Sequence, residues 1–306
     1  MLVPMTPESA AAAVAAMRDV AAPVTDLDRI TIEAAWRFLF GQDTPLNVDF
    51  LPPFDPAPLQ SESERAQVAH AVAVMPFVDG KLDAEKASRA ATIAASLGVN
   101  DGAATALHEV AAHQLKAVLA CMIRENVISL HNGPAPDEDD MAYFFPYRNA
   151  PDPGLVARHE ALADLPVGTL GREYHAFYQR NQFAFPGDPN GLTIEFAHPH
   201  DTTHLLSGYN TDPHGELLVS TFTAGMHPEN SVEAHILPVI FSWHLGIKLN
   251  DVAKSAVGSF DPEAFWRAWA RGQRVTTDVF APGWDFWGAC ERPLAELREA
   301  YGVPAP

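Results

Sequence analysis

Apolar residues recur at helical spacing along most of the chain, and alternating β patterns are scarce. Between these stretches, glycine, proline and acidic residues interrupt the period. The pattern predicts helices at residues 8–17, 30–40, 61–78, 84–97, 103–125, 151–166, 171–181, 199–206, 216–224, 233–249, 262–271 and 292–301. We therefore expect a mainly α fold.

A break in the pattern at residues 131–140 predicts a domain boundary. These ten residues contain one glycine, two prolines and four acidic residues, which is typical of a linker or an exposed loop. We expect two helical domains, residues 1–140 and residues 141–306, with a helix–loop–helix metal-site bundle in the second.

Composition narrows the class of protein. The 306 residues are 47% hydrophobic, which suits a globular protein with a sizeable core. A net charge of −19 makes nucleic-acid binding improbable and disfavours electrostatic docking on anionic lipid, whereas apolar docking stays open. The two cysteines, Cys121 and Cys290, are too few for a cysteine-type zinc site and fit two buried thiols better than a disulfide.

The N-terminal segment lacks the basic start of a signal peptide, because Arg18 follows the alanine run instead of preceding it. No stretch of about 18 consecutive apolar residues predicts a transmembrane helix. We expect a cytoplasmic protein that is at most peripheral to the inner face of the membrane.

Candidate chemistry gathers in the segment from His198 to Glu216. His200 and His204 are four residues apart, so on a helix both imidazoles share one face. Asp201 points about 100° away from His200, but in the first turn of a helix it can still reach the same ion. Otherwise Asp201 orients a histidine ligand from outside the coordination sphere.

Eleven residues separate His204 from Glu216, and they include Gly208 and Pro213, which turn the chain back. Pro199 suits the first turn of the preceding helix, because that turn leaves its N–H groups unpaired. The two segments would then offer His200, Asp201, His204 and Glu216 to one divalent cation. Zn²⁺, Fe²⁺ or Mn²⁺ suits such a mixture of imidazole and carboxylate.

Plainer interpretations exist for these residues. A histidine pair at this spacing is often surface or capping chemistry, and the neighbouring His198 and His214 fit an outer or solvent-facing position. The zinc-protease-like segment from His108 to His113 has its histidines five residues apart, which separates them by about 140° around a helix and disfavours a metal.

The motif resembles a known family. His-Asp-x-x-His, eleven residues and a glutamate form the signature of the fourth coenzyme Q (ubiquinone) biosynthesis protein. Residues 165–174 (LPVGTLGREY) resemble the approach segment of that family. Trp269-x-x-Gly272 and residues 296–304 resemble its closing helices. The resemblance covers roughly residues 150–306, and it departs at Thr203, where the family often has tryptophan. Residues 79–98 resemble a helical TerB-type module, which spans about residues 61–130.

The resemblance implies a mostly helical, membrane-peripheral protein with zinc or another divalent metal held by His200, Asp201, His204 and Glu216. It also implies action on a prenylated hydroxybenzoate ring, with the C1 carboxylate replaced by a hydroxyl. The expected partners are a lipophilic aromatic molecule and proteins of a biosynthetic assembly, and we expect a homo-oligomer. The alternative is a non-enzymatic lipid-binding scaffold with a structural metal.

Two further groups could serve the site. Arg172 can clamp a carboxylate in a bidentate manner or pair with a neighbouring acid such as Glu173. Tyr174, and also Tyr209, can donate to an oxyanion or simply pack in the core. The nearly all-apolar run at residues 234–245 fits a core helix, or else the wall of a tunnel for an isoprenoid tail that is kinked at Pro238.

Overall fold

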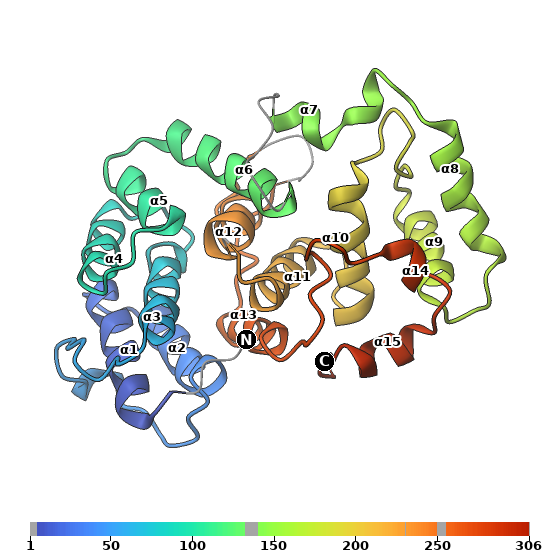
Figure 1. The fold of residues 1–306 in the computed structure, drawn as a ribbon. Helices are drawn as coiled ribbons and strands as arrows, with labels where there is room; N and C mark the ends of the chain where they lie inside the picture. The colour runs from blue at the N-terminus through green and yellow to red at the C-terminus, as the bar shows by residue number, and fades with distance from the viewer. Residues whose placement is uncertain (1–4, 132–139, 230, 250–254, 306) are drawn as a thin grey trace.

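The computed structural model describes residues 5–131, 140–229, 231–249 and 255–305. Within these ranges the chain is all α, which confirms the predicted class (Figure 1). β-Structure in the described chain is limited to two isolated bridges, Thr169 with Pro293 and Leu245 with Val257.

The helices fall into two stretches on either side of residues 132–139. The first stretch contains α1 (Pro7–Ala21), α2 (Asp26–Ala34), the π-helical turn η1 (Ala35–Leu39), the 3-10 turn η2 (Val48–Phe50), α3 (Glu62–Val74), the 3-10 turn η3 (Met75–Phe77), α4 (Ala84–Ser96), α5 (Gly102–Ala111) and α6 (Leu115–His131). The second stretch contains α7 (Asp140–Phe144), the 3-10 turns η4 (Pro146–Arg148) and η5 (Ala161–Asp164), α8 (Pro153–Glu160), α9 (Leu170–Asn181), α10 (Ile194–Ser207), α11 (Pro213–Met226), the π-helical turn η6 (Ser231–Ile236), α12 (Leu237–Trp243), α13 (Pro262–Gly272), α14 (Phe286–Ala289) and α15 (Leu294–Ala300).

Side-chain caps explain where many of these helices begin. Thr25 and Asp28 form a capping box on α2, and Ser61 and Glu64 form another on α3. Each pair satisfies two backbone N–H groups that a helix start would otherwise leave unpaired. Gly98 follows α4 with a φ of +75°, which ends the helix in a conformation that favours glycine.

The prediction of one helix over residues 103–125 was wrong, because the chain breaks between α5 and α6. His113 adopts the left-handed conformation with a φ of +59°, and no helix continues through such a residue. His108 and His113 therefore do not share a helix, so the expected angle of about 140° between them around one helix does not apply.

Proline also behaves differently from the prediction in two places. α10 begins at Ile194, five residues earlier than expected, so Pro199 lies inside the helix. The Thr203 hydroxyl donates to the Pro199 carbonyl over 2.8 Å. The expected helix over residues 233–249 is instead η6 followed by the short α12, with Pro238 in the first turn of α12, where its missing N–H costs nothing.

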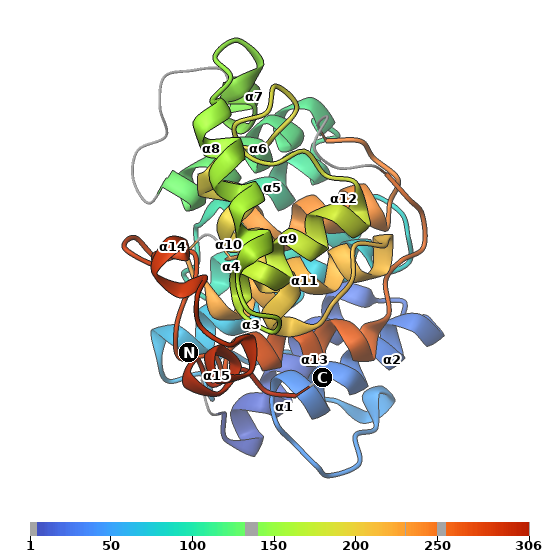
Figure 2. The same ribbon diagram turned by 90° about the vertical axis from the view of Figure 1, so that its right-hand side faces the viewer.

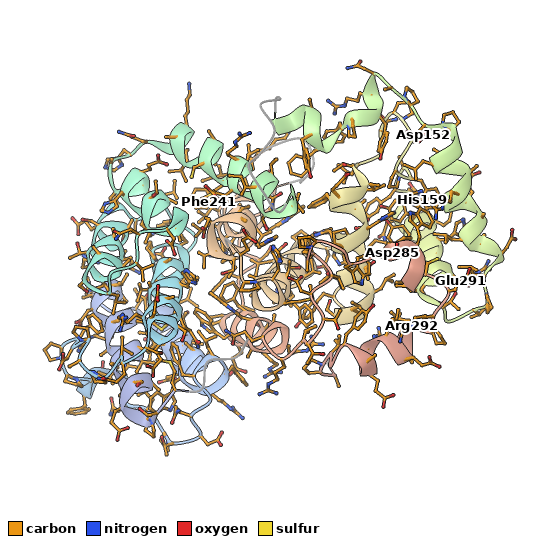
Figure 3. All side chains as sticks on the ribbon, viewed as in Figure 1. Asp152, His159, Phe241, Asp285, Glu291 and Arg292 are labelled. Atoms are coloured by element: carbon orange, nitrogen blue, oxygen red, sulfur yellow. The ribbon has the colours of Figure 1, made fainter. Side chains whose placement is uncertain are left out.

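Two apolar clusters hold the molecule together. The first joins α1–α6 to one side of α11, α12 and α13, with Phe77 and Phe241 in edge-to-face contact at a centroid distance of 5.3 Å (Figure 3 labels Phe241). The second joins the end of α6 and α7, α9, α10, α14 and α15 to the other side of α11. α11 contributes Leu217 to the first cluster and Phe222 to the second.

The helices α11–α13 accordingly lie between the N-terminal helices α1–α5 and the group formed by α8–α10 and α14 (Figures 1 and 2). The predicted domain boundary at residues 131–140 falls mostly on residues 132–139, outside the described chain. The first cluster draws residues from both sides of that boundary.

In the described part of the chain, no helix combines the length and the apolar character needed to cross a bilayer.

Candidate metal centre

A tight loop brings the end of α10 and the start of α11 together. Gly208 ends α10 with a φ of +82°, and the Asp212 side chain accepts a hydrogen bond from the Gly215 backbone N–H at the start of α11. A Cβ atom on Gly215 would lie 2.0 Å from Oδ1 of Asn210, so only glycine allows the loop to fold onto the first turn of α11. Glu216 follows directly and faces α10.

His200 and His204 lie on the same face of α10, as their spacing predicted. Their rings are 4.9 Å apart between centroids and nearly perpendicular. Nδ1 of His204 lies 3.0 Å from the carbonyl oxygen of Tyr209, so Nδ1 donates and Nε2 keeps its lone pair for a cation. His200 stacks on Phe196 at 4.7 Å, which fixes the plane of its ring.

Glu216 spans the two imidazoles. Its Oε2 lies 3.6 Å from Nε2 of His200, and its Oε1 lies 3.6 Å from Nε2 of His204. Burial raises the pKa of Glu216, but the two adjacent histidines outweigh burial and lower this pKa to about 2. Burial lowers the pKa of His204, yet the adjacent Glu216 carboxylate raises it above its ordinary value. The glutamate is therefore an anion between two imidazoles.

Asp201 joins the same group, although its helical direction differs from that of His200. Ligand atoms of His200, Asp201 and His204 all lie within 4.8 Å of one another, which is close enough for one cation. Burial raises the pKa of the Asp201 carboxyl group, against the charge of His200 and a hydrogen bond from Tyr178. The Tyr178 hydroxyl donates to Oδ2 of Asp201 over 2.6 Å.

A cavity of about 790 Å³ adjoins these side chains. His200, Asp201 and Glu216 line one part of it, together with Tyr178. Much of the remaining wall is apolar and comes from α6, η6 and α12 with neighbouring segments: Met122, Ile123, Phe145, Ala234, Pro238, Val239 and Trp243. The cavity therefore joins a polar end to an apolar chamber, which suits an amphiphilic ligand.

The two residues predicted to act on substrate lie away from this cavity. Arg172 is half-buried in the first turn of α9, and it is not among the residues that line the cavity. The neighbouring Glu173 accepts a hydrogen bond from the Gly168 backbone N–H over 3.3 Å. Tyr174 is fully buried, and its hydroxyl donates to the hydroxyl of Tyr178 over 2.8 Å. Tyr209 does not line this cavity either, and its hydroxyl accepts a hydrogen bond from Arg271 over 2.6 Å.

Sequence reasoning missed two features of the site. The first is the hydrogen bond from Tyr178 to Asp201. The sequence signal for it was the position of Tyr178 four residues after Tyr174, on the same face of α9.

The second is a buried histidine pair. His159 and His198 approach each other through their Nε2 atoms at 2.9 Å, and burial is the main cause that lowers the pKa of both (His159 is labelled in Figure 3). His198 is thus a buried residue of α10, not a solvent-facing one.

Known proteins give little direct guidance. No protein-family model and no curated protein matches the chain. The crystal structure of a putative ubiquinone biosynthesis protein from Nostoc punctiforme aligns with 80% of this chain and 100% of its own, at a TM-score of 0.35 and 16% identity.

Proposed function

We propose that the chain binds one divalent cation through His200, Asp201, His204 and Glu216 and uses it to act on an amphiphilic aromatic ligand. One observation supports this most strongly: two imidazoles and two carboxylates converge at the polar end of a cavity whose other walls are largely apolar. Buried carboxylates are costly unless they are paired, and a cation would neutralise both acids.

The donor set fits a borderline metal. Two imidazole nitrogens with carboxylate oxygens suit Zn²⁺, Fe²⁺ or Mn²⁺. When bound, such an ion acts as a Lewis acid that anchors a ring carboxylate or phenolate and stabilises negative charge as it develops on the ring. The protein's part is to hold the ligand atoms in register and to exclude water from the reacting carbon.

The class of ligand follows from the shape and lining of the cavity together with the resemblance of residues 150–306 to the coenzyme Q biosynthesis family. A prenylated hydroxybenzoate would place its ring at His200, Asp201 and Glu216 and its isoprenoid tail along α12. The proposed reaction releases the C1 carboxylate as CO₂ and puts a hydroxyl from water in its place, while dioxygen takes up the two electrons and two protons set free and leaves as hydrogen peroxide. Zinc has no redox chemistry, so a zinc-loaded protein would leave the activation of dioxygen to the substrate.

Metal content tests the site. Purified protein is expected to hold about one divalent ion per chain, and His204→Ala and Glu216→Ala should each lose it, because each removes a ligand. His214→Ala is the matched control, since His214 lies on α11 but bonds the carbonyl of Ser259 at 3.0 Å. Full metal content in both ligand variants would contradict the proposal.

Mass spectrometry of a prenylated hydroxybenzoate incubated with the metal-loaded protein in air tests the reaction. Loss of CO₂ with gain of a hydroxyl is the expected result, and Glu216→Ala should abolish it. If the ligand binds but keeps its carboxylate, the apolar chamber favours the second role: a lipid-binding component of a biosynthetic assembly.

A further inference from the structure

Three side chains form a line of hydrogen bonds at the site. It begins at Tyr174, passes through Tyr178 on the same helix α9, and ends at Asp201, one of the candidate metal ligands. The Tyr174 hydroxyl donates to the hydroxyl of Tyr178 over 2.8 Å, and Tyr178 donates to Oδ2 of Asp201 over 2.6 Å. All three residues are buried. In both hydrogen bonds the phenol hydroxyl is the donor, and the last acceptor of the chain is the Asp201 carboxyl group.

Packing fixes the position of the Tyr178 hydroxyl. The ring of Tyr178 is stacked between Tyr174, at a centroid distance of 4.7 Å, and Phe185, at 4.8 Å. Tyr174 is held in turn by Phe286 at 4.7 Å. A ring clamped on both faces cannot change rotamer without displacing its neighbours, so the donor stays aimed at Asp201.

The hydrogen bond from Tyr178 determines which oxygen of Asp201 is available to a cation. A carboxylate can bind a cation through one oxygen or through both. A short hydrogen bond from a neutral donor commits Oδ2 to Tyr178, and that leaves Oδ1 as the oxygen free to bind a cation beside His200 and His204. Binding through one oxygen would take up one coordination position instead of two, and would leave room for an oxygen of the ligand in the cavity.

We propose that Tyr178, backed by Tyr174, is a positioning residue that holds Asp201 as a one-oxygen ligand and so keeps the cation accessible from the cavity. This inference rests on the proposed function, because it presupposes that the four side chains bind a divalent ion.

Co²⁺ titration of the full-length protein tests the inference without any assay of activity, because the visible spectrum of Co²⁺ reports its coordination number. Tyr178→Phe removes only the hydroxyl and keeps the stacked ring. We expect it to weaken Co²⁺ binding about 10- to 100-fold, the usual effect of deleting a partner of a metal ligand, and to change the visible spectrum as Asp201 rotates to use both oxygens.

Two further variants sharpen the test. Tyr174→Phe removes the outer hydroxyl alone and should give a smaller change in the same direction. Tyr301→Phe deletes a partly buried hydroxyl that accepts a hydrogen bond from Trp284 over 3.2 Å, and it should match the wild type. Circular dichroism and thermal melting confirm that each variant is folded.

The outcomes separate the two proposals. A wild-type protein that binds no Co²⁺ overturns the metal site and this inference together. A wild-type protein that binds Co²⁺ while Tyr178→Phe binds it with the same affinity and the same spectrum overturns this inference alone. A larger effect from Tyr174→Phe than from Tyr178→Phe would also overturn it, because the hydroxyl that donates to Oδ2 of Asp201 is that of Tyr178.

Discussion

The ammonium group of Lys86 lies 3.0 Å from Oδ1 of Asp28, and both side chains are almost completely buried. Asp28 also accepts hydrogen bonds from the backbone N–H and the hydroxyl of Thr25, so the pair ties α4 to the first turn of α2. Asp28→Asn would leave the Lys86 charge uncompensated in the interior. We expect it to lower the free energy of unfolding by about 3 kcal/mol in urea denaturation.

Asp49→Asn provides the matched control for this change. Asp49 pairs with Arg29 at 3.0 Å, but its side chain is 63% exposed. Exposed pairs contribute little, so this variant should unfold like the wild type. Equal effects of the two substitutions would contradict the importance of burial here.

Gly272 and Gly225 allow α13 and α11 to touch through their backbones. A Cβ atom on Gly272 would lie 2.0 Å from the carbonyl oxygen of Phe222, and one on Gly225 would lie 2.3 Å from that of Trp269. Gly272→Ala should therefore push α11 away and destabilise the fold by about 1–3 kcal/mol. Thermal unfolding measures the loss of stability. Zinc titration measures the loss of zinc affinity that follows, because α11 contributes Glu216.

An alanine at Gly154 is the comparison for that variant. The nearest atom to a Cβ there is Oδ1 of Asp152 at 3.3 Å, with no backbone in the way. This variant should keep its stability and its zinc affinity. A Gly272→Ala protein as stable as Gly154→Ala would show that the two helices can separate at no cost.

Glu233 should make stability depend on pH near neutrality. It is 3% exposed, its Oε2 has no hydrogen-bond partner, and burial is the main cause that raises its pKa to about 7. Asp101 and Glu125 raise this pKa further, and His70 opposes them. The folded protein keeps the proton up to about pH 7, whereas the unfolded chain loses it near pH 4.5, so stability falls as pH rises between these values.

Urea denaturation at pH 5, 6, 7 and 8 measures that fall, which should reach about 3 kcal/mol in the wild type. Glu233→Gln cannot ionise and should flatten the dependence, becoming the more stable protein at pH 8. Glu85→Gln, at a side chain 91% exposed, should leave the slope unchanged. Parallel curves for the wild type and Glu233→Gln would rule out Glu233 as the source.

Val239 on α12 offers a way to shrink the apolar chamber without touching the candidate ligands. Val239→Trp adds an indole ring to a wall of the cavity of about 790 Å³. Binding of a geranylgeranylated hydroxybenzoate, measured by calorimetry, should weaken at least about tenfold, or roughly 1.4 kcal/mol, while zinc content stays the same. Val257→Trp, at a residue 77% exposed, should bind like the wild type.

Much of the fold could be predicted because its signals are local. Helical spacing and side-chain caps such as Ser61 with Glu64 act within one turn of the chain. The break between α5 and α6 could not be predicted in this way, since Ala112, His113 and Gln114 include neither glycine nor proline. The left-handed conformation of His113 and the place of Pro199 inside α10 depend on contacts made only after the helices pack.

The same division applies to the candidate site. The spacing of His200 and His204, and the turn before Glu216, are local features that the sequence contains. The contact between Tyr178 and Asp201 exists only because α9 packs beside α10. The spacing of Tyr174 and Tyr178 places them on one face of α9, but it does not identify the helix that this face meets. The motif around Tyr174 predicts a role for Tyr174 at the site, whereas Tyr178, one turn later on α9, makes the contact with Asp201.

The position of α11 in both apolar clusters has a consequence for how the molecule comes apart. Leu217 belongs to one cluster and Phe222 to the other, and Glu216 precedes them on the same short helix. Loosening either cluster removes support from the helix that both require. We therefore expect a single cooperative melting transition, in which the N-terminal helices and the cation-binding geometry disappear together. A destabilising substitution in α1–α5 would then lower the metal affinity of the site, although the substituted residue makes no contact with the ligands.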